Sequence, residues 1–351
     1  MHVTIRPLDP SSDLELEQIN ALDEACDEDA FGGREVLTVD QRRARLSPSE
    51  YFRARRFVAV AETIEGGQSI VGIASVEVPL KENLEDVYVG LGVHPAFRGH
   101  GIGTALLEQA VIPAVRESGR TRVGSFGEIP ADGDADDPAL PANRLAARLG
   151  IERKNIAICR TLALPLADDL MDRLECSARE KQGEYRIEVW DDEVPEEHLA
   201  AYGVLLRQLD LDDPDEDFEF EAADYTPERI RDQERRRRER GTREIIAVAI
   251  APDGTMVGNS VIDVQTTPGT TIGWQENTLV MPDHRGHRLG LALKVAVHRE
   301  LARTAPDLQA LATWNSHVNP WMIAINEQLG YEIAHREIAY QGAVAHDTME
   351  T

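Results

Sequence analysis

The fold is decided by the stretch Gly92-Val93-His94-Pro95-Ala96-Phe97-Arg98-Gly99-His100-Gly101-Ile102-Gly103, which follows a predicted strand and opens a predicted helix. The first amides of a helix have no intrahelical partner, and the helix dipole favours an anion there. Glycines let the backbone approach such an anion closely, and Arg98 adds charge-assisted hydrogen bonds. The stretch therefore predicts a phosphate-binding cradle, although a single glycine-rich turn also fits a simple tight turn between a strand and a helix.

The same pattern occurs a second time. The stretch Leu279-Val280-Met281-Pro282-Asp283-His284-Arg285-Gly286-His287-Arg288-Leu289-Gly290 aligns with the first. Further along, Arg148-Leu149-Gly150-Ile151 aligns with Gln328-Leu329-Gly330-Tyr331. A repeat of this length indicates a duplicated domain, because solenoid units repeat every 20–50 residues or so.

The predicted elements follow the same order in both halves. In the first half we expect strands at 2–8, 57–63, 69–78, 86–93, 121–126 and 152–162, and helical segments at 12–27, 40–53, 102–117 and 140–149. In the second half we expect strands at 185–190, 244–250, 255–265, 271–280, 308–313 and 331–339, and helices at 196–209, 227–240, 289–303 and 320–329. The chain is thus predicted to consist of an N-terminal domain (1–165), a helical connector (166–182) and a C-terminal domain (183–345).

Length and composition agree with two globular domains. A chain of 351 residues exceeds the roughly 250–300 residues that one hydrophobic core serves. It contains no apolar run near the roughly 20 residues that span a bilayer, and its first residues lack a secretory signal pattern, so we expect a cytoplasmic location. The net charge of −26 disfavours nucleic acid and anionic membranes as partners. Three widely spaced cysteines predict neither a disulfide framework nor a metal site.

With both copies of the pattern in view, the sequence resembles the GCN5-related N-acetyltransferase (GNAT) family over nearly its whole length. Thr278–Gly290, together with Thr313-Trp314-Asn315 and Asn319-Pro320-Trp321-Met322, resembles the two-domain, mycothiol synthase-like group. The resemblance implies a mixed α/β (α+β) chain of two tandem GNAT folds, each a central mixed, mostly antiparallel sheet flanked by helices. It also implies an N-acetyltransferase that uses acetyl-coenzyme A and acts on an amine. Rossmann and Walker phosphate loops are excluded, because their glycine and lysine patterns are absent from this sequence.

The resemblance assigns a coenzyme A site to each cradle. In the N-terminal half the residues are Leu91, Val93, Arg98, Gly99, His100, Gly101, Ile102, Gly103 and Thr104. In the C-terminal half they are Leu279, Val280, Met281, Arg285, Gly286, His287, Arg288, Leu289, Gly290, Asn315 and Asn319. We interpret His284 and His287 as phosphate-contacting or loop-packing residues, because no third metal ligand accompanies them. Arg288 occupies the place in the second copy that Gly101 has in the first. An arginine is tolerated there if its φ is helical, whereas a positive φ would weaken coenzyme binding.

The two copies differ at the positions expected to carry chemistry. The family's asparagine at the start of the last helix is Ala139 in the first copy and Asn319 in the second. The tyrosine that acts as general acid in the family is Ala146 in the first copy and Asn326 in the second. Asn326 cannot donate as an acid, and Tyr331 is either a proton donor or a core ring. These differences favour the C-terminal half for catalysis and leave the proton donor open.

Glu276 and Val280 are the remaining catalytic candidates. Regular strand alternation places Glu276 with Thr278 and Val280 on one face of their strand, and Gln275, Asn277 and Leu279 on the other. Glu276 is then a general base that receives the amine proton through water, or a solvated carboxylate. The backbone amide of Val280 is expected to polarise the thioester carbonyl. The alignment of the copies places Val89 opposite Glu276, so the first half lacks this carboxylate.

The acceptor is the least determined part of the prediction. The acidic block Asp210–Glu221, with Phe218, Phe220 and Tyr225, either forms the wall of a pocket for a small cationic amine, such as an aminosugar or antibiotic-like molecule, or is a solvated loop. Two other functions stay open. One is a degenerate acetyl-CoA-binding sensor or scaffold, and the other is a resistance protein that sequesters a drug in a large pocket between the halves. The sequence also leaves open whether the chain is a monomer or a homodimer.

Overall fold

The structure, a computed structural model, describes residues 2–62, 67–212 and 218–344. Thr63, the middle of the acidic block (213–217) and residue 345, which ends the predicted C-terminal domain, lie outside the described residues. The first half contains β1 (Val3–Pro7), α1 (Asp13–Phe31), α2 (Val39–Leu46), β2 (Phe52–Glu62), β3 (Gln68–Pro79), β4 (Asp86–Val93), a 3₁₀ turn (Pro95–Phe97), α3 (Ile102–Leu106), a π-helical turn (Leu107–Val111), α4 (Ile112–Glu117), β5 (Arg122–Pro130), α5 (Pro141–Leu149) and β6 (Glu152–Ala163).

The second half follows a connector helix, α6 (Asp168–Gln182). It contains β7 (Arg186–Asp191), a 3₁₀ turn (Glu196–His198), α7 (Leu199–Asp212), α8 (Pro227–Glu239), β8 (Thr242–Ile250), β9 (Met256–Gln265), β10 (Ile272–Val280), a 3₁₀ turn (Pro282–His284), α9 (Leu289–Thr304), β11 (Ala310–Ser316), α10 (Pro320–Leu329) and β12 (Glu332–Ala343). Within the described residues no helix is both long and apolar enough to cross a membrane. The repeated order of elements predicted from the sequence is confirmed.

Two predicted helices differ from the observed ones, and a proline explains each difference. The helical stretch expected at 40–53 ends at Leu46, because Ser47 precedes Pro48 and takes an extended conformation with ψ of 144°. The single helix expected at 102–117 contains a π-helical turn directly before α4, whose first turn holds Pro113. Proline has no amide to continue the hydrogen-bond ladder, so the helix changes its pattern there.

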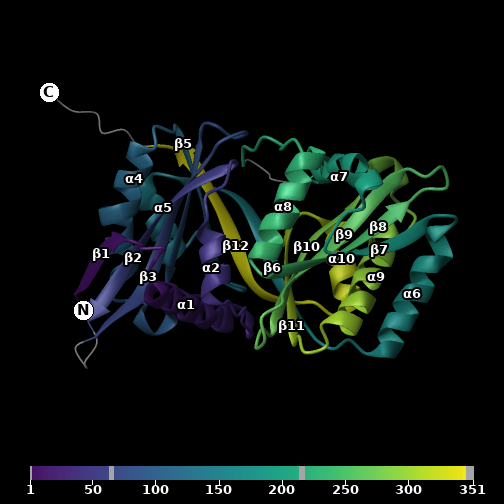
Figure 1. Cartoon of the computed structure of the whole chain (residues 1–351), viewed down its shortest axis with the longest axis horizontal. Helices are drawn as coiled ribbons and strands as arrows, with labels where there is room; N and C mark the ends of the chain where they lie inside the picture. Colours follow the sequence, from purple (N-terminus) through teal and green to yellow (C-terminus); the bar gives the residue numbers. More distant parts are fainter. Residues whose placement is uncertain (1, 63–66, 213–217, 345–351) are drawn as a thin grey trace.

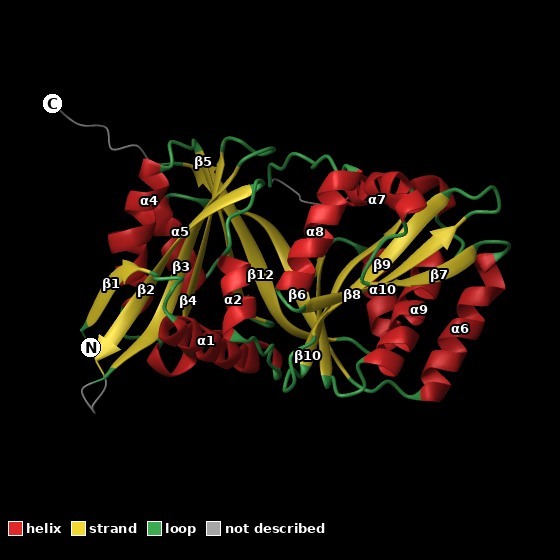
Figure 2. Ribbon diagram, viewed as in Figure 1, coloured by secondary structure: helices red, strands yellow, loops and turns green. Residues whose placement is uncertain are grey.

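The twelve strands of the described residues form one continuous sheet, in the order β1-β2-β3-β4-β5-β12-β6-β11-β10-β9-β8-β7. The pairs β4–β5 and β10–β11 are parallel and the other pairs are antiparallel. The mixed, mostly antiparallel sheet flanked by helices is therefore confirmed, and it crosses the whole molecule (Figure 2).

The last strand of each half is exchanged between the halves. β12, which ends the second half, lies between β5 and β6, and β6, which ends the first half, lies between β12 and β11 (Figure 1). Ile338 and Tyr340 of β12 accordingly belong to the N-terminal core, whereas Leu162 of β6 belongs to a C-terminal core. Each half of the sheet is thus completed by a strand from the other half of the chain.

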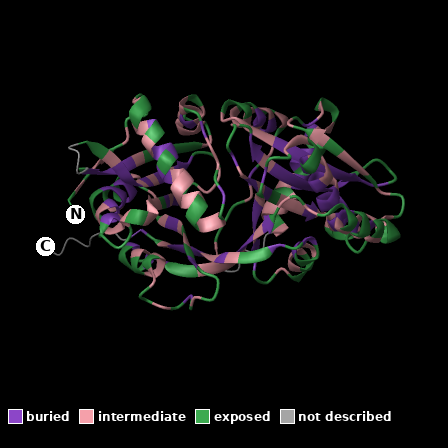
Figure 3. Cartoon of the chain, turned by 90° about the horizontal axis from the view of Figure 1, so that it is seen from below, coloured by how far each residue is buried: buried purple, intermediate pink, exposed green. Residues whose placement is uncertain are grey.

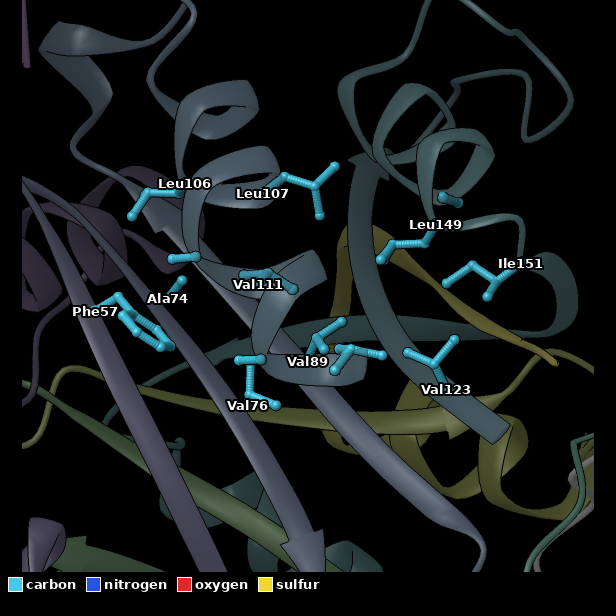
Figure 4. Packing of buried hydrophobic residues seen from close by; sticks show 14 of the residues in the cluster. Phe57, Ala74, Val76, Val89, Leu106, Leu107, Val111, Val123, Leu149 and Ile151 are labelled. Atoms are coloured by element: carbon cyan, nitrogen blue, oxygen red, sulfur yellow. The ribbon is translucent and has the colours of Figure 1, made fainter. Parts of the chain in front are cut away.

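Helices cover both faces of the sheet, and strand alternation fixes which face each side chain meets. Ile245, Ala247 and Ala249 of β8 pack with α9 on one face, while Ile246 and Val248 pack with α7 on the other. In the N-terminal half α3, α4 and α5 pack against strand residues including Phe57, Val89 and Val123 (Figure 4). Buried residues follow the strands and exposed residues the outer sides of the helices (Figure 3). Helices α1, α2, α7 and α8 share the face on which the cavity described below opens.

Candidate functional site

The two predicted cradles have the same backbone shape. Gly99 and Gly101 have φ of 78° and 79°, and the corresponding Gly286 and Arg288 have φ of 87° and 54°. Helices α3 and α9 begin directly after these residues without a side-chain cap, whereas Ser12, Thr38 and Thr226 cap α1, α2 and α8. The first amides of α3 and α9 are therefore available for an anion, as the sequence predicts.

The arginine at the head of each cradle has an internal role. Arg98 Nε donates to the carbonyl oxygen of Val93 at 3.2 Å, and its guanidinium forms an ion pair with Asp29 at 2.6 Å. Arg285 makes the corresponding contacts, with the carbonyl of Val280 at 3.0 Å and with Asp212. Both arginines thus fasten the loop to the strand before it and to the helix beside it. His100 is held in the same way, by contacts with the carbonyls of Phe97 and Arg98.

Arg288 has a left-handed backbone conformation, so of the two possibilities left open by the sequence, a helical or a positive φ, the structure has the positive one. A non-glycine residue in this conformation costs roughly 1–2 kcal/mol. Its guanidinium donates to the carbonyl of Ser177 at 2.6 Å and pairs with Glu180 at 2.8 Å, both on α6. The side chain therefore points to the connector helix, and these contacts hold the cradle in the shape that glycine gives the first copy.

The two histidines of the second cradle pack against Tyr185. The Tyr185 hydroxyl lies 2.9 Å from His284 Nδ1, and the ring of His287 lies 5.0 Å from the Tyr185 ring. Among the described residues no group of three or more His, Cys, Asp or Glu side chains is arranged to bind a metal ion. The loop-packing interpretation of these histidines accounts for both contacts.

β10 and β11 separate at the point where chemistry is expected. Their parallel pairing runs from Ile272 to Trp274, while β10 continues to Val280. Met281 donates its amide to Val257 of β9 at 2.8 Å, so the amide of Val280, one residue earlier, points to the opposite edge, toward β11. The Val280 amide therefore faces the opening between the strands, where it can donate to a carbonyl oxygen.

β10 contains a bulge at Glu276 and Asn277, between the pairs Gln275–Ile262 and Thr278–Ser260. A bulge adds one residue to a strand and breaks the alternation of faces. The predicted alternation is therefore wrong here, because Glu276 and Asn277 both line the same cavity.

The alignment of the two copies, which placed Glu276 opposite Val89, is wrong by one residue because of the bulge. Ser125 Oγ on β5 donates to the carbonyl of Val89 at 3.0 Å, and Thr313 Oγ1 on β11 donates to the carbonyl of Gln275 at 2.9 Å. These matching contacts make Gln275 the counterpart of Val89. The pairing of β3 with β4 is regular, so Glu276 belongs to an insertion that β4 lacks.

A cavity of 980 Å³ lies between the two halves, on the face covered by α1, α2 and α8. Its N-terminal wall comes from α1, α2, β2, β3 and the segments between them, and its C-terminal wall from α8, β8, β9, β10 and β11. Of the two parallel pairs, only β10–β11 contributes lining residues within the described chain. The cavity therefore reaches the separated strands of the C-terminal half and not those of the N-terminal half.

Three carboxylates meet at the C-terminal wall. Burial raises the pKa of Glu244 to about 7, although Arg237, whose guanidinium lies 2.8 Å from it, opposes this shift. Burial, and then the charges of Glu244 and Glu276, raise the pKa of Asp263 well above its ordinary value. Burial also raises the pKa of Glu276, which is open to the cavity solvent but surrounded by protein on its other sides. Glu244 can therefore exchange a proton near neutral pH, and Asp263 and Glu276 hold protons more readily than ordinary carboxyls do.

Two stacked tryptophan rings of the C-terminal half form another part of the lining, and a phenylalanine of the N-terminal half packs against them. Trp274 of β10 stacks on Trp314 of β11, with 5.8 Å between ring centroids, at the place where the strands separate. Phe31 from the end of α1 packs its edge on both rings at 5.2 and 5.7 Å. Sequence reasoning missed these rings as site residues. The only signal for Trp274 was its position two residues before Glu276.

The described part of the acidic block does not line the cavity, so the described residues give no support to the pocket-wall alternative. Phe218 stacks on Phe126 of β5, and Glu219 bonds Gln341 of β12 through its backbone and pairs with Arg122. Tyr225 donates to Asp210. The block instead attaches the second half to β5 and β12, because its carboxylates find basic and amide partners there.

The predicted asparagines are occupied by internal contacts. Asn319 Oδ1 accepts the amide of Met322 and caps α10. Asn315 Oδ1 accepts from Arg160 at 2.8 Å and from Asn326 at 3.3 Å, and Asn326 Oδ1 accepts from Lys294 at 2.7 Å. This buried chain includes Arg160 of the exchanged strand β6 and Lys294 of α9, neither of which sequence reasoning identified.

Tyr331 lies in the C-terminal core. Of the two roles considered from the sequence, proton donor or ring of the hydrophobic core, its position fits the second. It is 5% exposed, and burial raises the pKa of its hydroxyl. Neither Tyr331 nor Asn326 belongs to the cavity lining. Lys294 lies over the Tyr331 ring, and burial lowers the pKa of this lysine to about 7.

Comparisons with known proteins agree with this architecture. Residues 53–138 match the acetyltransferase (GNAT) domain family. No curated protein sequence matches the chain. The chain is similar in structure to a tandem GNAT protein from the clavulanic acid biosynthesis pathway, with a TM-score of 0.73 and 23% identity, covering 99% of this chain and 100% of that one.

Two further structures share the fold. A GCN5-related N-acetyltransferase from Sphaerobacter thermophilus has a TM-score of 0.62 and 18% identity, covering 98% of this chain and 96% of that one. Saccharomyces cerevisiae N-myristoyltransferase with bound myristoyl-CoA has a TM-score of 0.56 and 14% identity, covering 97% of this chain and 79% of that one. At these identities the likeness concerns the fold, which extends over the whole chain in each case.

Proposed function

From the premise that this chain is a tandem GNAT-fold protein with a GNAT domain match at residues 53–138, we propose that it transfers an acetyl group from acetyl-CoA to an amine of a small molecule. The proposal places the chemistry in the C-terminal half. The observation that carries this assignment is the cavity, which reaches β10 and β11 where they separate and reaches neither β4 nor β5 within the described chain. An acceptor in this cavity meets only the C-terminal opening.

The residues of the second cradle fit the phosphates of coenzyme A. The amides at the start of α9 have no side-chain cap, and a Cβ at Gly286 would meet no atom within 4 Å, so the space above the loop is open. The cradle residues Arg285–Gly290 would hold the phosphates, and the edges of β10 and β11 would hold the pantetheine arm. When bound, the coenzyme supplies the acetyl group as a thioester. The first cradle has the same shape and would bind a second coenzyme.

Glu276 and Val280 would then have two different roles, one toward the amine and one toward the thioester carbonyl. An ammonium acceptor must lose a proton before its nitrogen can attack, and Glu276 is a carboxylate with a raised pKa in the same cavity. The Val280 amide, aimed at the gap between the strands, would stabilise negative charge on the carbonyl oxygen. Asp263 and Glu244 adjoin Glu276 and would accept the proton from it.

A second candidate function is retention of a small molecule without turnover. Its support is the size of the cavity, 980 Å³, at the upper end of the roughly 300–1,000 Å³ typical of ligand pockets. The position of the family's proton-donating tyrosine is held by Asn326, whose amide is already bonded to Lys294 and Asn315. A chain of this kind would bind coenzyme and ligand and release no thiol.

Thiol release separates the two functions. The intact chain is incubated with acetyl-CoA and a panel of amines that includes aminosugars, aminoglycosides, polyamines and amino acids, and free thiol is measured with a chromogenic disulfide. Acceptor-dependent release, with the acetylated amine seen by mass spectrometry, supports the transferase. Calorimetric binding of acetyl-CoA with no release above the acceptor-free background would support retention instead.

A further inference from the structure

The arginines that line the cavity differ in their partners, and Arg236 donates to the carbonyl oxygens of Pro48 and Ser47. Arg45 pairs with Glu35 at 2.6 Å, Arg237 with Glu244 at 2.8 Å and Arg229 with Glu82 at 2.6 Å. Arg56 of β2 reaches Glu77 only at 3.4 Å. Within the described residues Arg240, the C-cap residue directly after α8, makes no side-chain hydrogen bond or ion pair, and its Nε is buried without a partner.

Arg240 and Arg56 lie in a basic part of the cavity. Burial lowers the pKa of Arg240, and repulsion from Arg236, Arg45 and Arg56 lowers it further, while the charge of Asp232 opposes the shift. Burial also lowers the pKa of Arg56. A partly buried guanidinium without a partner is costly for the fold, because a buried charge normally requires an opposite one. The missing partner is therefore expected to be an anion from solution.

The cavity holds a carboxylate cluster and an arginine group on different elements, and Arg237 and Glu35 act between them. Glu244, Asp263 and Glu276 influence one another at the wall formed by β8, β9 and β10. The arginine group lies where α8 of one half meets α2 and β2 of the other, and Arg240 is influenced by residues from both halves. A ligand that satisfies both regions has a cationic or amine end and an anionic end.

We propose that the acceptor carries a carboxylate in addition to its amine, and that Arg240 and Arg56 bind this carboxylate while the amine lies at Glu276. This inference rests on the proposed function and specifies its substrate class as amino acids in the broad sense, with the two groups at a distance. A planar guanidinium matches a carboxylate with two parallel hydrogen bonds. A single negative charge suits the site better than a phosphate dianion, because Glu77 remains close to Arg56 and the charge of Asp232 acts on Arg240.

The experiment uses ω-amino acids of four to eight carbons, each paired with its own primary amide, which keeps the shape and removes the charge. Turnover is measured by thiol release, and binding by calorimetry, for the wild-type chain, Arg240→Gln and Arg240→Lys. Arg238→Gln is the matched control, since Arg238 is exposed on the same helix and reaches acidic residues only at 3.9 Å. Aminoalkylphosphonates of the same lengths test the alternative anion, and thermal unfolding checks that each variant is folded.

The wild-type chain should prefer at least one carboxylate over its amide about 10- to 150-fold in kcat/KM, the range expected for a hydrogen bond to a charged group. Arg240→Gln should abolish the preference through KM, Arg240→Lys should restore part of it, and Arg238→Gln should leave it unchanged. Equal use of acid and amide, or a preference that survives Arg240→Gln, overturns the inference and leaves the transferase intact, and a preference for phosphonates overturns the choice of anion. If no amine is acetylated, the proposed function fails. The anion site is then tested by calorimetry alone: binding that prefers the carboxylate over its amide and depends on Arg240 supports the site, and binding without that preference overturns it.

Discussion

Replacing Ile338 by alanine should destabilise the N-terminal half of the molecule, although Ile338 belongs to the last strand of the chain. Ile338 is 0% exposed, and β12 places it between Gly127 of β5 and Ile156 of β6. It shares a core with Val123 and Leu149. Truncating a buried isoleucine to alanine costs about 2–5 kcal/mol, through lost burial and the cavity left behind.

The assay is native-state hydrogen exchange read separately in the two halves. A loss of about 2 kcal/mol or more corresponds to roughly 30-fold faster opening, and we expect it for amides of β4, β5 and α4. Ile333→Ala on the same strand is the control, because Ile333 is 52% exposed and its truncation should change stability by less than about 0.5 kcal/mol. Leu162→Ala in β6 is the reciprocal change and should affect the C-terminal half. Faster exchange confined to α9 and β8 in Ile338→Ala would refute the strand exchange.

Two further predictions concern the active half. The rate of acetyl transfer should fall as the pH is lowered through the raised pKa of Glu276, because a protonated carboxyl cannot accept the amine proton. The measurement is kcat/KM from pH 5 to 9. A profile without an acid limb, or with an acid limb at the ordinary pKa of glutamate, would contradict this prediction. At position 288, where φ is 54°, the Arg288→Gly variant should be more stable than Arg288→Ala by about 1 kcal/mol in denaturant unfolding. Both variants lose the contacts with α6, and only alanine keeps the backbone strain. Equal stabilities of the two variants would argue against the left-handed conformation.

Local patterns in the sequence were sufficient to predict the helices and strands and the two phosphate-binding cradles. The strand ending at Val93, the glycines at 99 and 101 and the helix from Ile102 are all set by residues close in sequence, and the structure has them as expected. The second copy has the same backbone shape despite Arg288, because contacts with α6 compensate for the missing glycine.

Features that depend on distant contacts were not predictable in this way. The exchange of β6 and β12 leaves the periodicity of both strands unchanged, so no local pattern distinguishes it from two self-contained sheets. The bulge at Glu276 adds one residue without a glycine or proline to mark it, and the regular alternation assumed from the sequence therefore failed. The cavity combines Glu35, Trp274 and Arg240 from three distant segments, whereas the described part of the acidic block that stood out in the sequence packs elsewhere.

The most direct test of the central claim is the effect of Glu276→Gln on turnover. With an acceptor identified by thiol release, the variant should lose roughly 10²–10⁴-fold in kcat while calorimetric affinity for acetyl-CoA stays within about twofold, because the substitution removes a base and leaves the cradle untouched. Glu188→Gln, a strand carboxylate of the same half that pairs with Arg186 outside the cavity, should keep full activity. Turnover by Glu276→Gln equal to that of the wild type would contradict the assignment of catalysis to the C-terminal half.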